Sequence, residues 1–176
     1  PNIYYYIDQF NLSDLSKLNN KISIIYRNYK KEVRNETIYS LKSFCKTTKR
    51  KLFIANNIKL AINLRLDGVY IPSFNKKINF ASTFCYPINF KIIGSAHNIK
   101  EIKIKKMQKC SEIFISPIFK TEKSKNFLDI LKFNNLTLSQ KSKYIALGGI
   151  NKKNFKRLNL INIVGFAGIS GIKKTA

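Results

Sequence analysis

Two glycine-containing turns near the C-terminus are the residues of this sequence best suited to bind an anion. Gly148 and Gly149 follow the apolar run Tyr144–Leu147 and precede a segment with helical spacing, and Gly168 follows the run Ile163–Ala167. Glycine lets backbone amides approach a ligand closely, and unpaired amides at a helix N-terminus attract negative charge. We therefore predict that the two turns hold a phosphate group. Tight turns that bind nothing are the alternative.

The segment Ser116–Lys125 begins where the apolar run Ile113–Ser116 ends, and it concentrates cationic and hydroxyl side chains. Thr121, Lys123 and Lys125 are its candidate ligands, because hydroxyl and ammonium groups both donate hydrogen bonds to phosphate oxygens. This segment is therefore a candidate clamp for a second anion. A solvated run of charges is the alternative.

His97 is the only histidine, and it follows the apolar run Phe90–Gly94. The unperturbed pKa of imidazole lies near neutrality, which suits general acid–base catalysis, and a purely structural role is the alternative. Other polar residues also come directly after apolar runs: Asp8, Arg27, Lys30, Asn56, Asn57, Ser73, Asn75 and Ser95.

Eight short runs rich in Ile, Val, Phe and Tyr predict the β-strands that position these residues. The runs are Ile3–Ile7, Ile22–Tyr26, Leu52–Ala55, Gly68–Ile71, Phe90–Gly94, Ile113–Ser116, Tyr144–Leu147 and Ile163–Ala167. Segments with helical spacing lie between most of them: Leu12–Leu18, Lys31–Lys46, Ile58–Leu64, Ile99–Cys110, Leu128–Leu138 and Lys152–Leu158, with an irregular piece at Lys76–Tyr86.

Strands that alternate with helices imply a parallel sheet, and eight of them favour a compact (β/α)₈ TIM barrel. Such barrels usually need about 250 residues. With 176 residues in one predicted domain, residues 1–176, we expect a trimmed barrel, and a doubly wound open sheet is the fallback. In a barrel, the polar residues named above would meet at the carboxyl ends of the strands, where active sites lie.

The net charge of +24 makes nucleic acid a partner to consider. The basic residues are spread along the chain, and their densest group (Lys103, Lys105, Lys106 and Lys109) lies on one predicted helix. Lys, Asn and Ile all have A/T-rich codons, so genomic base composition explains much of the excess. We therefore expect phosphorylated small molecules rather than nucleic acid as partners.

Cysteine spacing and hydropathy indicate a cytoplasmic protein. Cys45, Cys85 and Cys110 form no C-x-x-C pair, and we interpret them as reduced, mostly buried thiols. No apolar run reaches the ~18 residues of a membrane span, and Pro1–Asp8 lacks the pattern of a signal peptide. We expect no membrane contact, and homo-oligomerisation stays open.

Four segments in register resemble the thiamine phosphate synthase and TenI family. They are Gly94–His97, Ile115–Thr121, Ile145–Ile150 and Gly165–Ser170, and the resemblance extends to Leu52–Asn56, Leu60–Ala61 and Asp67–Val69. The resemblance implies a (β/α)₈ barrel that joins hydroxymethylpyrimidine pyrophosphate to thiazole phosphate, releases pyrophosphate and forms thiamine phosphate. It also implies that magnesium helps the pyrophosphate to leave.

The resemblance further assigns roles by position. It places the thiazole phosphate on Gly149, Ile169 and Ser170, beside Gly148. It places the pyrophosphate on Arg27, Ser95, Thr121 and a lysine of the Lys123–Lys125 segment. We predict catalytic roles for three residues: Arg27 and Ser95 from this set, and His97.

The sequence also departs from the synthase pattern. Where synthases carry carboxylates that bind magnesium, this chain has Asn56 and Asn75, and a neutral amide is a poor ligand for a hard dication. Tyr29 replaces a usual lysine. A TenI-like thiazole tautomerase that uses His97 and needs no metal is therefore an alternative, as is a non-catalytic relative that binds a phosphate ligand or nucleic acid.

Overall fold

The computed structural model describes residues 1–29, 35–79, 85–122, 124–139 and 141–168. The strands are β1 (Asn2–Ile7), β2 (Ile22–Tyr26), β3 (Leu52–Ala55), β4 (Gly68–Ile71), β5 (Lys91–Ala96), β6 (Glu112–Ile115), β7 (Tyr144–Leu147) and β8 (Gly165–Gly168). They pair in chain order, all parallel, and β8 pairs with β1 to close the barrel. The predicted (β/α)₈ barrel is confirmed, and the open sheet is excluded.

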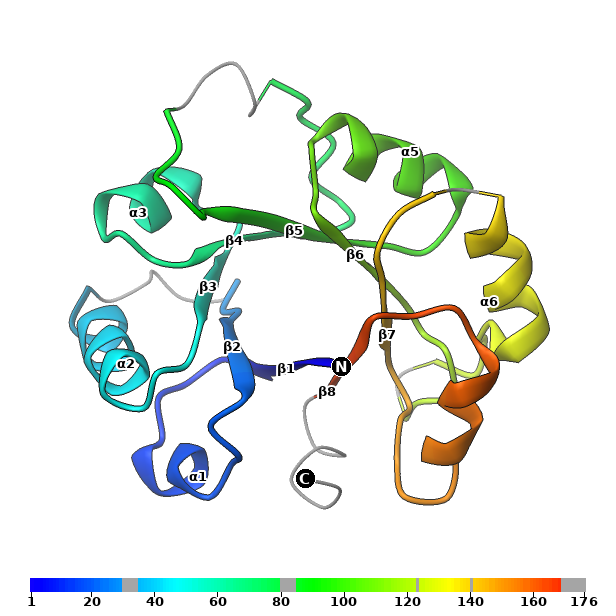
Figure 1. Ribbon diagram of the computed structural model, residues 1–176, viewed down its shortest axis with the longest axis horizontal. Helices are drawn as coiled ribbons and strands as arrows, with labels where there is room; N and C mark the ends of the chain where they lie inside the picture. The colour runs from blue at the N-terminus through cyan, green and yellow to red at the C-terminus, as the bar shows by residue number, and fades with distance from the viewer. Residues whose placement is uncertain (30–34, 80–84, 123, 140, 169–176) are drawn as a thin grey trace.

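The strand labels run clockwise in Figure 1. Connections between parallel strands are right-handed, so the view is from the amino ends of the strands. Helices surround the barrel in this view, as the fold requires.

The barrel interior is packed with side chains from alternate strand positions. Nine buried residues form this inner cluster: Tyr4, Tyr6, Ile25, Phe53, Tyr70, Ile93, Phe114, Ile145 and Ala167. The aromatic rings meet edge to face, with the centroids of Tyr4 and Phe114 4.9 Å apart. Strands of four to six residues are long enough to enclose this cluster, so the short barrel has a solid core and no pore.

The helices are short, which explains how the barrel fits in this chain. They are α1 (Leu12–Ser16), α2 (Asn35–Thr47), α3 (Ile58–Asn63), α5 (Ile99–Met107) and α6 (Asp129–Leu138), followed by the 3₁₀ helix η1 (Phe155–Leu160). Between β4 and β5 the described residues, 72–79 and 85–90, form neither helix nor strand, as predicted for Lys76–Tyr86. No helix in the described part of the chain is long and apolar enough to cross a bilayer.

Several predicted element boundaries differ from the structure, and two of the differences affect the site. The segment Lys152–Leu158 is not an α-helix, since η1 begins only at Phe155. The side chains of Asn151 and Asn154 accept hydrogen bonds from nearby amides and hold the preceding residues in turns instead. β5 also continues past Gly94, because Ser95 and Ala96 extend its pairing with β6.

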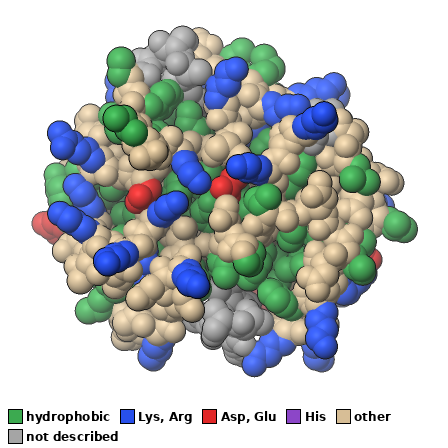
Figure 2. All heavy atoms as spheres, viewed as in Figure 1, with side chains coloured by type: hydrophobic (Ala, Val, Ile, Leu, Met, Phe, Trp, Pro, Cys, Tyr) green, Lys and Arg blue, Asp and Glu red, His purple; other side chains and the backbone are tan. Residues whose placement is uncertain are grey.

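The amino end of the barrel is closed by a buried carboxylate. Glu112 is 2% exposed and accepts hydrogen bonds from the Tyr4 hydroxyl at 2.8 Å and from Asn2 Nδ2 at 3.0 Å. Lys91 Nζ lies 3.6 Å from the same carboxylate. Burial and the neighbouring Glu112 together raise the pKa of Tyr4 well above its usual value. Around the middle of this face, Figure 2 shows several Lys and Arg side chains.

Candidate active site at the carboxyl ends of the strands

The predicted site residues that the structure describes lie at or just below the carboxyl ends of the barrel strands. Arg27 follows β2, Asn56 follows β3, and His97 follows β5. Gly148 and Gly149 follow β7. Lys30, Lys123, Ile169 and Ser170 lie outside the described residues, so their predicted roles are neither supported nor opposed by the structure.

Arg27 brings a positive charge to the centre of the barrel mouth. Its amide donates to Ile7 O at 2.7 Å, which continues the pairing of β1 with β2 by one residue. The guanidinium carbon then lies 4.7 Å from the centroid of the Tyr6 ring, an interior side chain. A cation held against an aromatic face is favourable and leaves its outward N–H groups to bind an anion.

Ser95 lies inside the barrel and not in a loop. It belongs to β5 on the same side as Ile93, pairs with Phe114 and is 5% exposed. The prediction that Ser95 follows the strand was therefore wrong, although its role in substrate binding stays a prediction. The reason is that the hydrogen-bonded ladder to β6 extends over two more residues than the apolar run.

His97 is held by groups from two neighbouring strand ends. Its Nδ1 lies 2.7 Å from Ser116 O, and its Nε2 lies 3.1 Å from Ser73 Oγ. A carbonyl oxygen only accepts, so Nδ1 carries a proton and donates to Ser116 O, and in the neutral tautomer Nε2 accepts from the Ser73 hydroxyl. The exposed imidazole therefore has a fixed orientation, which suits proton transfer at Nε2.

The turn after β7 packs against the segment after β6, backbone to backbone. Gly148 and Gly149 have φ angles of +93° and +73°, and a Cβ at Gly149 would lie 2.5 Å from the carbonyl oxygens of Phe119 and Lys120. Ile118 N and Phe119 N donate to Leu147 O and Gly148 O. These glycines are therefore required by packing, which is a sufficient reason for their presence even without a ligand.

The predicted row of unpaired amides after Gly149 is only partly present. The amides of Asn151, Lys153 and Asn154 donate to the side chains of Asn151 and Asn154, at 2.8 to 3.3 Å. Thr121 lies beside the turn, since a Cβ at Gly148 would contact its methyl group at 3.8 Å. Lys125 is exposed. Phosphate binding by this turn stays a prediction.

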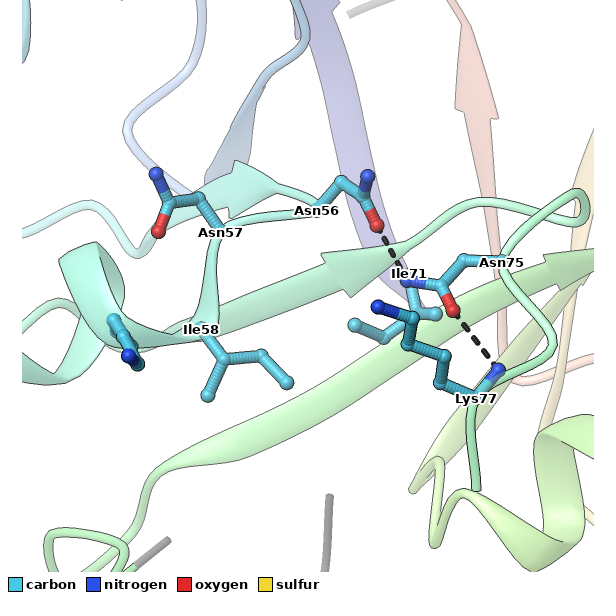
Figure 3. A pocket seen from close by; sticks show the side chains of 7 residues that line it. Asn56, Asn57, Ile58, Ile71, Asn75 and Lys77 are labelled. Atoms are coloured by element: carbon cyan, nitrogen blue, oxygen red, sulfur yellow. Dashed lines mark hydrogen bonds between the residues drawn. The ribbon is translucent and has the colours of Figure 1, made fainter. Parts of the chain in front are cut away.

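A cavity of about 260 Å³ lies between the ends of β3 and β4. It is lined by Asn56, Asn57, Ile58, Lys59, Ile71, Asn75 and Lys77. Asn75 Nδ2 donates to Asn56 Oδ1 at 2.6 Å, and Asn75 Oδ1 accepts from the Lys77 amide at 3.0 Å. Figure 3 shows both of these hydrogen bonds.

The residues of this cavity do not fit a magnesium ion. The amide oxygens of Asn56 and Asn75 already accept hydrogen bonds, and neutral oxygens are weak ligands for a dication. Within the described residues, no group of three His, Cys, Asp or Glu side chains could hold a metal. Asn56 and Asn75 were predicted as doubtful metal ligands. In the structure they form a hydrogen-bonded pair.

Sequence analysis missed the part that Lys105 plays in the site. We grouped it with the other lysines of one predicted helix, but it is fully buried, and its Nζ donates to Pro72 O, Asn75 O and Gln108 Oε1 at 2.8 to 3.0 Å. Gln108 Nε2 donates to Asn75 O and Lys77 O. Together they hold the segment that carries Ser73 and Asn75. The spacing from buried Ile102 to Lys105 was the available signal, because i and i+3 share a helix face.

Fold and site together define a (β/α)₈ barrel with a polar, partly cationic site at the carboxyl ends of its strands. Residues 17–172 match the family model described as thiamine monophosphate synthase. The chain belongs to this family, which confirms the resemblance.

Individual relatives agree with this assignment. A thiamine-phosphate synthase from Prochlorococcus marinus is 32% identical over 139 residues, which are 77% of this chain and 37% of that protein. This chain thus spans little more than a third of that curated relative. A solved structure of thiamine phosphate pyrophosphorylase from Pyrococcus furiosus superimposes with a TM-score of 0.75 at 16% identity, over 98% of this chain and 90% of that one.

The fold alone is shared more widely. FabK from Thermotoga maritima superimposes with a TM-score of 0.71 at 8% identity, over 97% of this chain and 58% of that one. Identities this low establish the barrel and say nothing about the reaction.

Proposed function

We propose that this chain condenses hydroxymethylpyrimidine pyrophosphate with thiazole phosphate to give thiamine phosphate and pyrophosphate. The family match over residues 17–172 is the observation that carries the proposal. The C–O bond between the pyrimidine methylene and the pyrophosphate breaks, and the pyrophosphate leaves with the electron pair. The thiazole nitrogen then supplies its lone pair to the methylene cation and forms the C–N bond.

In this proposal Arg27 binds the pyrophosphate. Its guanidinium at the barrel mouth supports this role, because charge grows on the leaving group as the C–O bond breaks and a fixed cation stabilises that charge. Ser95, Thr121, Lys123 and Lys125 bind the same group in this proposal. The thiazole phosphate binds the turns at Gly148–Gly149 and at Ile169–Ser170. A cytoplasmic location and homo-oligomerisation stay predictions.

Arg27 separates this function from the alternatives. We expect Arg27→Gln to lower kcat/KM for condensation by about 100-fold or more, because a cation that stabilises the leaving group is lost. Arg65→Gln is the matched control, since Arg65 is exposed and follows α3 at the opposite end of the barrel. Product formation is followed by chromatography with both substrates present. Equal activity of the two variants would contradict the role of Arg27.

A thiazole tautomerase is the second candidate, and the geometry of His97 favours it. The ring is fixed by Ser116 O and the Ser73 hydroxyl, and a neutral Nε2 can take up a proton from a substrate carbon. In the tautomerase, His97→Ala abolishes conversion between thiazole tautomers. In the synthase, the same variant keeps condensation activity within about tenfold of the original protein, since no step above needs an imidazole proton.

A further inference from the structure

The cavity between β3 and β4 presents positive charge and hydrogen-bond donors. Lys59 and Lys77 line it, and both are exposed at its rim. In Figure 3 the Lys77 side chain extends into the cavity toward Ile71, on the side of the Asn56–Asn75 pair. No carboxylate is among the lining residues. The charge of the cavity is therefore the reverse of what a magnesium ion requires.

The three asparagines of the cavity use their oxygens elsewhere. Asn57 Oδ1 caps α3 by accepting from Leu60 N at 3.0 Å. Asn56 Oδ1 accepts from Asn75, and Asn75 Oδ1 accepts from the Lys77 amide. An amide whose oxygen is engaged offers N–H groups to a ligand. Asn56 and Asn57 therefore suit phosphate oxygens better than a cation.

A third ammonium group lies directly behind this wall. Lys105 Nζ donates to three oxygens, and three acceptors match the three donors of an ammonium group. One of these acceptors is the backbone oxygen of Asn75 itself. A buried cation at this place opposes a dication at Asn75 and favours an anion in the cavity.

We propose that this cavity binds the pyrophosphate group directly, without a divalent cation, and that the Lys77 ammonium takes the place of the metal ion. The inference rests on the proposed function for the identity of the diphosphate. Lys77 donates hydrogen bonds to the leaving oxygens and stays protonated, so no proton transfer is added to the reaction. Lys59 and the N–H groups of Asn56 and Asn57 bind the same anion.

Calorimetry with inorganic pyrophosphate tests the inference without any turnover. Titrations are made in EDTA and, separately, with excess magnesium, for the unmodified chain, Lys77→Met and Lys76→Met. Lys76 is exposed, adjacent in sequence and absent from the cavity lining, so the two variants lose the same charge and differ only in its position. Circular dichroism checks that both variants fold.

We expect the unmodified chain to bind pyrophosphate in EDTA. We expect Lys77→Met to weaken that binding at least tenfold and Lys76→Met to change it less than twofold. We expect magnesium not to strengthen it, because magnesium complexes pyrophosphate in solution. Binding that requires magnesium, or equal weakening by both variants, would overturn the inference. A double substitution, Asn56→Asp with Asn75→Asp, should make binding depend on magnesium, and failure to do so counts against the inference.

The outcomes distinguish this inference from the proposed function. Metal-free binding that depends on Lys77, without condensation activity, supports the anion site and removes the synthase. Condensation that stops in EDTA supports the synthase and removes the anion site.

Discussion

Lys105 shows how a single residue links the barrel wall to the candidate site. Its ammonium group is fully buried and holds Pro72 and Asn75 by their carbonyl oxygens. The same segment places Ser73 against His97 and Asn75 against Asn56. A side chain on α5, away from any substrate, therefore determines the positions of groups on two sides of the mouth.

Removing this ammonium group should destabilise the protein. Lys105→Met keeps the volume of the stem but removes three hydrogen bonds and leaves Gln108 Oε1 buried without this donor, so we expect the free energy of unfolding to fall by about 2 kcal/mol or more. Lys103→Met, an exposed change on the same helix, should stay within about 0.5 kcal/mol. Urea unfolding gives both values, and equal effects would contradict the buried position of Lys105.

The same residue predicts a pH dependence of stability. Burial lowers the pKa of Lys105 to about 8, against about 10.4 in an unfolded chain. Between these values the unfolded state binds more protons than the folded state, so this group makes the free energy of unfolding rise with pH over that window. Below about pH 8 both states are protonated, and the contribution is constant.

The difference in unfolding free energy between the original chain and Lys105→Met isolates this effect from all other groups. It should rise by up to about 3 kcal/mol from pH 8 to pH 10.4. Urea unfolding at several pH values measures it. A difference that stays flat, or falls, over this window would mean that the ammonium group is not desolvated.

At the scale of elements, the strands could be predicted and the loops could not. Strands of a closed barrel are buried on both faces, so they appear as continuous apolar runs, and β2, β3, β4 and β7 begin and end at the predicted residues. Ser95 was misplaced because barrel interiors also accept small polar residues, which interrupt the apolar run.

The helical segments were predicted less well than the strands, because contacts that the sequence does not show determine them. Lys105 was grouped with the neighbouring lysines because residue type says nothing about the carbonyl oxygens of Pro72 and Asn75, which lie far away in sequence. The turn before η1 was missed because Asn151 and Asn154 compete for the amides that an α-helix would use. The family motifs still predicted the place of Arg27, His97 and the glycines.

The loops after β6 and β7 pack together as one unit. Within this unit, we expect Gly149 to tolerate substitution least. Gly149→Ala places a methyl group 2.5 Å from two carbonyl oxygens at a positive φ, so we expect a loss of about 2 kcal/mol or more. Gly148→Ala meets Pro117 at 3.0 Å and should cost less. Urea unfolding of both variants gives the order, and a harmless Gly149→Ala would contradict the packing of these loops.

At the scale of the whole molecule, one buried polar network lies at the end of the barrel opposite the candidate site. Glu112, Tyr4 and Lys91 close the amino end, and Arg27 and His97 lie at the carboxyl end. This separation lets the loops of the candidate site change without loss of the buried network beneath.

The net charge of +24 should accelerate the capture of anionic substrates. Raising the ionic strength from about 0.01 M to about 0.1 M shortens the Debye length from about 30 Å to about 10 Å. We expect kcat/KM for the pyrophosphate substrate to fall at least about threefold over this range, because long-range attraction is screened. Steady-state kinetics in NaCl and in KCl should agree, and an unchanged kcat/KM would exclude electrostatic steering.

The aromatic filling of the barrel has a practical consequence. The chain contains no tryptophan. Tyr4, Tyr6 and Tyr70 are buried inside the barrel, and the rings of Tyr6 and Tyr70 are in edge-to-face contact. Near-ultraviolet optical activity therefore includes a contribution from the barrel interior, while far-ultraviolet signals follow the secondary structure. Comparing the two signals during unfolding would show whether the barrel interior loses its packing before the helices unfold.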